Sequence, residues 1–251
     1  MKLWKLSDGQ TQWRSGVTQV STGRGRMGEP DLIYAFPDPM LAVFMNPTAG
    51  TTMRLWQCEG EPVFSDGLQI ACTNLPIVRE VSPPEVTPEM RARFAILVAQ
   101  LAFRDREWVT WSHAWLSDRE RSASASERAA RAARAAIAAA ARYAACALSS
   151  AADVSAATDA GSLALRADAA CIAAADAADD ARAASAAAFA ADAACAASRA
   201  TNAEEEAYVA RVAAYAVRAA MSTSWIAKDA TVDLVALARR ACGLRRRAPK
   251  Q

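Results

Sequence analysis

The segment from Gly23 to Gly28, GRGRMG, combines the residue types in this chain that best suit ligand binding. Its glycines leave backbone amides accessible, and two arginines add positive charge, so the loop can cradle a phosphate group. The letters also fit the GxGxxG pattern, but a dinucleotide fingerprint follows a strand and opens a helix, whereas a Glu-Pro pair and a predicted strand come next here. We therefore reject a Rossmann site and expect a flexible, solvated loop, with a phosphate-binding loop as the alternative. The predicted ligand-binding residues are Gly23, Arg24, Gly25, Arg26 and Gly28.

No other group of residues forms a recognisable catalytic set. Ser112 and His113 are adjacent, but neighbours on a helix point about 100° apart and cannot act as a nucleophile–base pair. GxSxG, HExxH, P-loop and paired-carboxylate motifs do not occur in the sequence. We predict that His113 lies on a helix surface, that no residue is catalytic and that the chain holds no cofactor.

The cysteines are widely separated and include no CxxC pair, and the only histidine is far from them in sequence. This pattern favours reduced, buried thiols of an intracellular protein and gives no metal-ligand set. The six cysteines are Cys58, Cys72, Cys146, Cys171, Cys195 and Cys242.

Alanine content divides the chain into two parts. Fifty of the hundred residues from Arg121 to Ala220 are alanine, against nine of the first 120. We predict two domains, residues 1–116 and 117–251. The expected fold class is α+β: a small N-terminal mixed α/β domain, followed by an alanine-rich antiparallel helical bundle or hairpin.

Short apolar runs between turn signals predict strands in the first domain. Asp66-Gly67 is a hairpin turn signal after Val63-Phe64. Asp38 precedes a proline and predicts a short helix, and Thr87 does the same for a longer one with a core-facing stripe of Met90, Phe94, Leu97, Val98 and Leu101. The predicted strands are Lys2–Leu6, Val17–Val20, Leu32–Phe36, Thr52–Cys58, Leu68–Cys72 and Pro76–Val81, and the short helix is Pro39–Met45.

Three tryptophans, Trp108, Trp111 and Trp115, share one side of a further predicted helix. We expect them to seal the alanine-rich region onto the first domain, and a platform for stacking nucleic-acid bases is the alternative.

Several segments of the first 115 residues resemble an uncharacterised family of phage and bacterial proteins, in which a small N-terminal domain precedes a repetitive, often alanine-rich tail. The matching segments are LWKLSDG at Leu3–Gly9, TQW and GVT within Thr11–Thr18, Gly28, IYAFPDPMLAVFMNP at Ile33–Pro47, RLWQCEG at Arg54–Gly60, DGLQIACTNLPIVREV at Asp66–Val81 and RFAILVAQ at Arg93–Gln100. Relatives usually carry a histidine where this chain has Tyr34, so no histidine chemistry is carried over. The resemblance implies a phage or prophage origin and no settled biochemical function.

Alanine is the best helix former, so the second half is expected to be helical nearly throughout. Ser117 to Glu120 and Thr201 to Glu204 both fit capping boxes that start helices. The Ser-, Asp- and Thr-rich segment 148–162 predicts a break, followed by a helix over Leu163–Arg199. A helix from Thr201 to about Met221 and a last one from about Asp229 to Cys242, capped by Gly243, complete the expected order.

Charge favours antiparallel pairing of the first two alanine-rich helices. The first carries arginines and the second aspartates, and such exposed pairs set register more than stability. The same pairing could join two chains, and the sequence leaves both possibilities open. Tyr208, Val212 and Tyr215 form a bulky stripe that we expect to pack against the first domain or the last helix.

Composition limits the function. A net charge of +2 gives no general attraction to nucleic acid, and no apolar run reaches the length of a membrane span or signal peptide, so we expect a cytoplasmic protein. The basic C-terminal residues complement a helix end, with nucleic-acid contact as the alternative. They are Arg239, Arg240, Arg245, Arg246, Arg247 and Lys250.

The leading expectation is a non-enzymatic phage-type accessory protein that binds a host protein or its own copies through the alanine-rich helices. The first alternative is a protein that binds or sequesters a small phosphorylated ligand, such as a nucleotide signal, and counters host defence. The second is a degenerate ADP-ribosyltransferase-like enzyme, for which the sequence offers no catalytic set.

Overall fold

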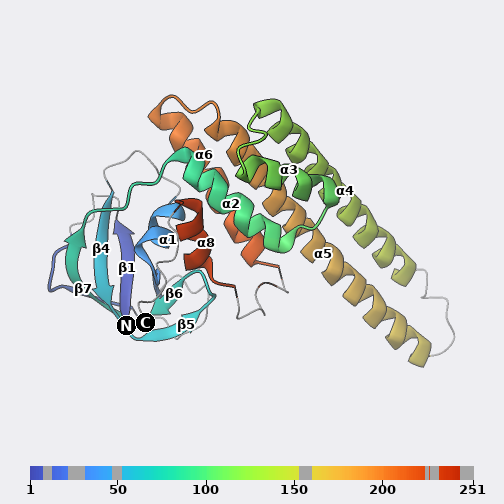
Figure 1. The fold of residues 1–251 in the computed structure, drawn as a ribbon. Coiled ribbons are helices and arrows are strands. Elements are labelled where there is room, and N and C mark those ends of the chain that lie inside the picture. Colours follow the sequence, from blue (N-terminus) through green and yellow to red (C-terminus); the bar gives the residue numbers. More distant parts are fainter. Residues whose placement is uncertain are drawn as a thin grey trace, which may run out of the picture.

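The computed structural model describes residues 1–7, 13–21, 32–46, 53–152, 160–223, 226 and 232–243, and of residues 147–152 and 160–168 it describes the backbone alone. Two small antiparallel sheets lie at one end of the molecule and helices form the rest (Figure 1). The α+β class predicted from the sequence is therefore confirmed.

The first sheet has the strand order β1-β4-β7-β2, and the second has the order β3-β6-β5. The predicted strands are confirmed with small shifts of their ends. The Asp66-Gly67 turn joins β5 to β6 as expected, with the Asp66 carboxylate accepting from the Leu68 N–H at 2.9 Å and Gly67 at a φ of 82°, which glycine adopts without strain. The strands are β1 (Lys2–Ser7), β2 (Thr18–Val20), β3 (Ile33–Ala35), β4 (Arg54–Glu59), β5 (Pro62–Ser65), β6 (Ile70–Cys72) and β7 (Asn74–Val81).

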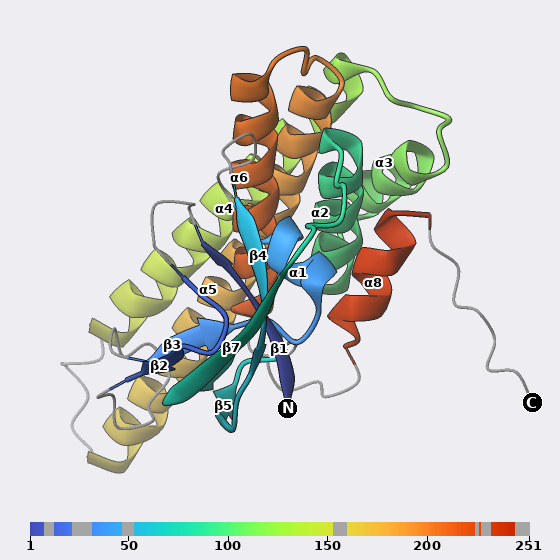
Figure 2. The ribbon, with the colours of Figure 1, turned by 90° about the vertical axis from the view of Figure 1, so that its left-hand side faces the viewer.

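The first sheet separates two groups of buried side chains, because alternate residues of a strand point to opposite faces. One face packs against the second sheet and contributes Leu3, Trp56 and Cys58 to that smaller core. The other face, which includes Leu55, packs toward the helices. Figure 2, viewed from the sheet side, shows β1, β4 and β7 in front of these helices.

Helix α1 (Pro39–Phe44) begins where the sequence predicted, with the Asp38 carboxylate accepting from the Met40 N–H at 2.8 Å. Its C-terminal end is held by Arg91, a buried arginine that donates to the carbonyl oxygens of Val43, Phe44 and Asn46 at 2.9, 3.1 and 3.3 Å. Burial lowers the pKa of Arg91 to about 10. This contact fixes α1 to α2.

Helix α2 (Pro88–Ala102) starts after Thr87, as predicted, and lies at the centre of the molecule. Phe94, Leu97 and Val98 of the expected stripe are buried, but Ala95 and Ile96 on other sides of the helix are buried as well. One core-facing stripe was an incomplete prediction, because α5 (Ala160–Ala197), α6 (Ala203–Met221) and α8 (Leu234–Ala241) all pack on α2.

The alanine-rich helices are longer than expected at the predicted break. Helix α4 continues to Ala152 and α5 starts at Ala160, so both extend into the segment 148–162 where the break was placed. The helix propensity of alanine carries α4 through Ser149 and Ser150, and Gly161 lies within α5. The rest of the predicted break, residues 153–159, lies outside the described residues. The remaining helices are α3 (Arg106–Leu116), α4 (Ala123–Ala152), α5 (Ala160–Ala197), α6 (Ala203–Met221) and α8 (Leu234–Ala241).

Both predicted capping boxes are displaced. Ser117 ends α3 instead of starting α4: its hydroxyl donates to the His113 carbonyl oxygen at 2.7 Å, and Ser122 caps α4 through the Ala125 N–H at 3.2 Å. At α6 the N-cap is Asn202, and not Thr201, with Asn202 accepting from two helix N–H groups. Asparagine is at least as good a cap as threonine, so the helix starts one residue later. The predicted ends near Met221 and at Cys242-Gly243 are confirmed.

Helices α4 and α5 form an antiparallel hairpin within one chain (Figure 1). The expected pairing of an α4 arginine with an α5 aspartate occurs within the chain between Arg134 and Asp192. A second ion pair, Arg199 to Glu127 at 2.6 Å, has the opposite polarity. One continuous cluster of buried apolar residues extends from Phe36 to Ala241 and crosses residue 116. The division into two domains stays a prediction.

Candidate functional site

The predicted phosphate loop, Gly23 to Gly28, lies outside the residues that the structure describes, as do the basic residues beyond Gly243. Of the basic C-terminal group, Arg239 and Arg240 lie in the last turn of α8 and are exposed. The loop therefore stays a prediction, and the candidate site must be sought elsewhere.

The tryptophan helix does not offer a stacking platform. Trp108 and Trp115 are each 1% exposed, and Trp108 Nε1 donates to the Ala187 carbonyl oxygen of α5 at 3.2 Å. The expectation that these rings attach the alanine-rich helices is confirmed for Trp108, whereas the base-stacking alternative is wrong. His113 is exposed on α3, as predicted.

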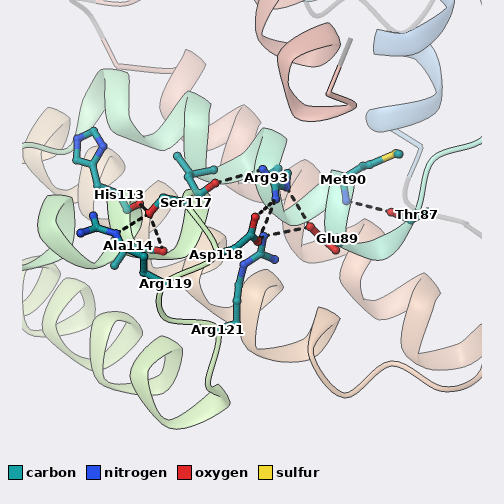
Figure 3. A network of polar contacts seen from close by, with 11 residues as sticks. Thr87, Glu89, Met90, Arg93, His113, Ala114, Ser117, Asp118, Arg119 and Arg121 are labelled. Carbon is teal, nitrogen blue, oxygen red and sulfur yellow. Dashed lines mark hydrogen bonds and ion pairs between the residues drawn. The ribbon is translucent and has the colours of Figure 1, made fainter. Parts of the chain in front are cut away.

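A polar network beside α3 has a structural role (Figure 3). Arg93 of α2 contacts Glu89 at 3.1 Å and Asp118 at 3.2 Å, and Arg121 contacts the same two carboxylates. The Arg121 guanidinium also lies 3.8 Å from the centre of the Trp115 ring. Asp118 has a positive φ of 61°, which aspartate tolerates better than most residues. The network thus fixes the turn between α3 and α4, with each carboxylate shared between two arginines.

The cysteines differ from the prediction that all are buried. Cys58, Cys72 and Cys195 are buried and Cys242 is half-buried, but Cys146 and Cys171 are exposed on the α4–α5 hairpin. All six are free thiols. Among the described residues, no cluster of histidine, cysteine and carboxylate side chains suits a metal ion.

Lys5 lies between the two sheets near Cys58 and Cys72. Its Nζ donates to the Tyr34 carbonyl oxygen at 3.1 Å and lies 5.7 Å from the centre of the Trp13 ring. Burial lowers the pKa of Lys5 and raises the pKa of Cys58 to about 11, so the thiol stays protonated at neutral pH and is a poor nucleophile. These contacts indicate a structural role.

A groove of about 470 Å³ lies on the other face of the first sheet. Figure 1 shows α1 and α8 beside this face. This volume is within the range of about 300–1,000 Å³ that is typical of small-molecule sites. Lys2 and Trp4 of β1, Leu55 and Gln57 of β4, and Arg79 and Val81 of β7 occupy alternate positions and so share this face. The lining residues are Lys2, Trp4, Asp38, Pro39, Met40, Leu55, Gln57, Arg79, Val81, Ser82, Pro84 and Arg239.

Three cations from distant parts of the sequence line this groove. The Arg79 Nε donates to Gln57 Oε1 at 3.1 Å, and Arg239 of α8 forms an ion pair with Asp38 at 3.3 Å. Lys2 is exposed, and its cross-strand partner Glu59 is not part of the lining. Among the described residues that line the groove, Asp38 is the one carboxylate, so this lining carries an excess of positive charge.

Fixed contacts position the groove's charges. The Asp38 carboxylate is engaged twice, by the α1 N-terminus through one oxygen and by Arg239 through the other. The Asp38 side chain is 12% exposed. Its carboxylate therefore orients Arg239 and contributes little negative charge to the open side of the groove. Gln57 is buried and holds Arg79 in the same way. Both guanidinium groups retain donors for a ligand.

The comparisons do not identify the chain: no family model, curated protein or solved structure matches it. The resemblance to a phage family accordingly stays a prediction. None of the described helices combines the length and apolar character needed to cross a bilayer.

Sequence reasoning missed the groove because its cations follow no local motif. Lys2, Arg79 and Arg239 come together only through strand pairing and through the packing of α8 on α1. Asp38 was recognised as a helix cap, but its ion pair with Arg239 bridges 201 residues. The alternating positions on β4 and β7 were the one available signal.

Proposed function

We propose that this protein binds a small anionic ligand in the groove between the first sheet, α1 and α8. The observation that carries the proposal is the convergence of Lys2, Arg79 and Arg239 on one concave surface with a single, already engaged carboxylate. A phosphate or carboxylate group is the natural complement, because the planar guanidinium group can bind either through two parallel hydrogen bonds.

The apolar part of the groove favours a phosphate carried on an organic group over inorganic phosphate. Trp4, Pro39 and Pro84 offer flat surfaces next to the charges, and Trp4 is half-buried. An aromatic ring can pack on such surfaces while its phosphate contacts the arginines. A nucleotide has both parts, so the proposal retains the phosphorylated ligand expected from the sequence but assigns it to different residues.

The groove chemistry supports binding over catalysis. Among the described lining residues, Asp38 is the one carboxylate and is used by the helix cap and Arg239, while the other polar groups are arginine, lysine, glutamine and serine. Acid–base chemistry needs a group that exchanges its proton near the working pH, and this lining provides no histidine or free carboxylate for that role.

The proposal is tested first by identifying what the purified protein carries. The protein is denatured, and its supernatant is analysed by mass spectrometry for a stoichiometric phosphorylated compound. Calorimetric titration of the full chain with mononucleotides and with inorganic phosphate then measures affinity.

Replacing Arg79 or Arg239 by alanine should weaken binding roughly tenfold or more, since a charge-assisted hydrogen bond contributes about 1.5–3 kcal/mol. Arg54→Ala is the matched control on the same sheet, because Arg54 pairs with Glu80 at 3.7 Å and is not part of the lining. Arg240→Ala is the control on α8. An absence of binding by all nucleotides and by phosphate, or an equal loss in the controls, would contradict the proposal.

A further inference from the structure

The outward side of α6 carries an alternating series of aromatic and cationic side chains. Tyr208, Arg211, Tyr215 and Arg218 are spaced by three, four and three residues, so they share one side of the helix. All four are exposed, and the two tyrosines are 46% and 51% exposed. The expectation that Tyr208 and Tyr215 pack against the first domain or the last helix is wrong, because Val212 and its buried neighbours, and not the tyrosines, face the core.

The neighbouring helix α5 extends this surface. Phe189 is 37% exposed, and its ring centre lies 5.9 Å from that of Tyr215. Arg182 lies seven residues before Phe189 and therefore on the same side of α5. The Arg182 side chain is 46% exposed, and its guanidinium contacts Asp179 at 2.5 Å. We call these six residues the aromatic–arginine surface: Arg182, Phe189, Tyr208, Arg211, Tyr215 and Arg218.

Charge decides which kind of partner this surface suits. Arg182 is paired with Asp179, whereas Arg211 and Arg218 form no ion pair within the described part of the chain. The exposed carboxylate that continues the α6 series is Glu204, one turn before Tyr208. The partner must therefore be anionic along the length of the surface. Rings and guanidinium groups that alternate over about 15 Å of helix suit a chain in which planar groups and negative charges also alternate.

We propose that the aromatic–arginine surface binds single-stranded nucleic acid. Bases stack on Tyr208, Tyr215 and Phe189, and the phosphates between them contact Arg211 and Arg218. Stacking of this kind tolerates any base, so the surface has little sequence preference. This role is separate from the ligand groove, whose lining contains none of the six residues.

The test measures binding of a fluorescein-labelled oligothymidylate of about 12 nucleotides to the full chain by fluorescence anisotropy. Stacking contributes about 1–3 kcal/mol per base, so Tyr215→Ala should weaken binding at least fivefold and Tyr215→Phe should retain it. The double variant Arg211→Ala/Arg218→Ala should bind more weakly and show a smaller salt dependence, since fewer counterions are released.

The α4–α5 hairpin provides matched controls. Arg142 and Tyr143 are exposed, with Tyr143 at 60%, but lie outside the aromatic–arginine surface, so Arg142→Ala and Tyr143→Ala should bind like the original chain. Arg54→Ala on the first sheet, outside both the groove and this surface, should also leave oligonucleotide binding unchanged. Circular dichroism of each variant checks that its helices are intact.

Three results would overturn the proposal: no oligonucleotide binding at low salt, an equal loss in the control variants, or binding insensitive to Tyr215→Ala. Polyglutamate could displace the oligonucleotide while the tyrosine variants bind it as the original chain does. This result would identify a surface for acidic polypeptides and would equally reject base stacking.

Discussion

Helix α5 passes through two environments although alanine predominates in both. From Ala183 to Cys195, ten of thirteen residues are buried, whereas from Ala169 to Arg182 only Ala177 and Asp179 of fourteen are. Helices α2, α4 and α6 all pack on α5, but the hairpin of α4 and α5 extends beyond the rest of the bundle (Figure 1). Alanine content therefore predicts helix in both halves and predicts burial in neither.

The difference between the halves comes from what the neighbouring elements supply. In the buried half of α5, residues 183–195, the Trp108 side chain of α3 donates a hydrogen bond to the backbone of α5. Small residues of α2 and α6 let these helices approach α5 closely. In the exposed half, α4 is the neighbouring helix, because the hairpin extends beyond the rest of the bundle. We refer to residues 183–195 as the buried half and to residues 169–182 as the exposed half.

Removing the Trp108 ring, which packs on the buried half of α5, should give the largest loss of stability. Trp108→Ala deletes a fully buried ring and its hydrogen bond to α5, and we expect the free energy of unfolding to fall by about 3–5 kcal/mol. Urea denaturation followed by circular dichroism measures this change. Trp111→Ala, at a half-buried ring of the same helix, should cost less. Equal costs would show that α3 does not attach to α5 mainly through Trp108.

A larger side chain should distinguish the two halves directly. Ala190→Leu inserts three carbons where the methyl group is 0% exposed, and overpacking of this kind destabilises by about 1–3 kcal/mol. Ala175→Leu in the exposed half should change stability by less than about 0.5 kcal/mol. Chemical denaturation of both variants provides the comparison. A similar loss at both positions would mean that the exposed half is covered in solution.

Much of the architecture follows from local sequence rules, and the rest depends on long-range packing. Asp38 and Thr87 identified two helix starts, and Asp66-Gly67 identified the hairpin, because capping and turn formation involve neighbouring residues. The prediction at Ser117 was wrong because a serine hydroxyl can cap the start of one helix or bind a carbonyl oxygen at the end of another. Here the Ser117 hydroxyl donates to a carbonyl oxygen at the C-terminal end of α3. The groove could not be predicted, since Lys2, Arg79 and Arg239 meet through tertiary contacts alone.

The two tyrosines of α6 show a similar limit. Their spacing from Val212 predicted one shared face, yet Tyr208 and Tyr215 have Arg211 and Arg218 beside them on the outward side. A bulky apolar ring was taken as evidence of burial, but a tyrosine has a polar hydroxyl and is often only partly buried. The arginines at intervening helical positions were the signal that could have corrected the prediction.

Alkaline pH should weaken the protein through the buried thiols between the sheets. Burial raises the pKa of Cys58 from 9.0 to about 11, so the unfolded chain loses this proton first as the pH rises. Stability from this group is complete below pH 9 and is lost between pH 9 and 11, by up to about 2 kcal/mol. The pKa of Cys72 is raised in the same direction.

Lys5 opposes this trend, because burial lowers its pKa and the unfolded chain then holds its proton more tightly. Cys58→Ala should therefore reduce the fall of stability between pH 9 and 11, whereas Cys171→Ala at an exposed position should not alter it. Thermal denaturation at a series of pH values measures the slopes. Identical slopes for the two variants would contradict the assignment to Cys58.

The smallest expected effect concerns the charges between α4 and α5. Asp192→Asn removes the ion pair with Arg134, whose side chain is 53% exposed, so the loss should be at most about 1 kcal/mol and should shrink in high salt. Asp180→Asn is the control, since the described residues offer Asp180 no ion pair in the exposed half. A loss well above this limit would assign the hairpin's stability to charge instead of methyl packing.

The methyl-lined interior around α5 also constrains how this sequence can drift over generations. Glycine is the one amino acid smaller than alanine, and it weakens a helix. At a fully buried position such as Ala190, every larger side chain must displace part of another helix. Random substitution should therefore be purged from residues 183–195 and accumulate in residues 169–182. In later descendants of this chain, residues 183–195 should stay nearly invariant. Residues 169–182 should change freely as long as they still form a helix.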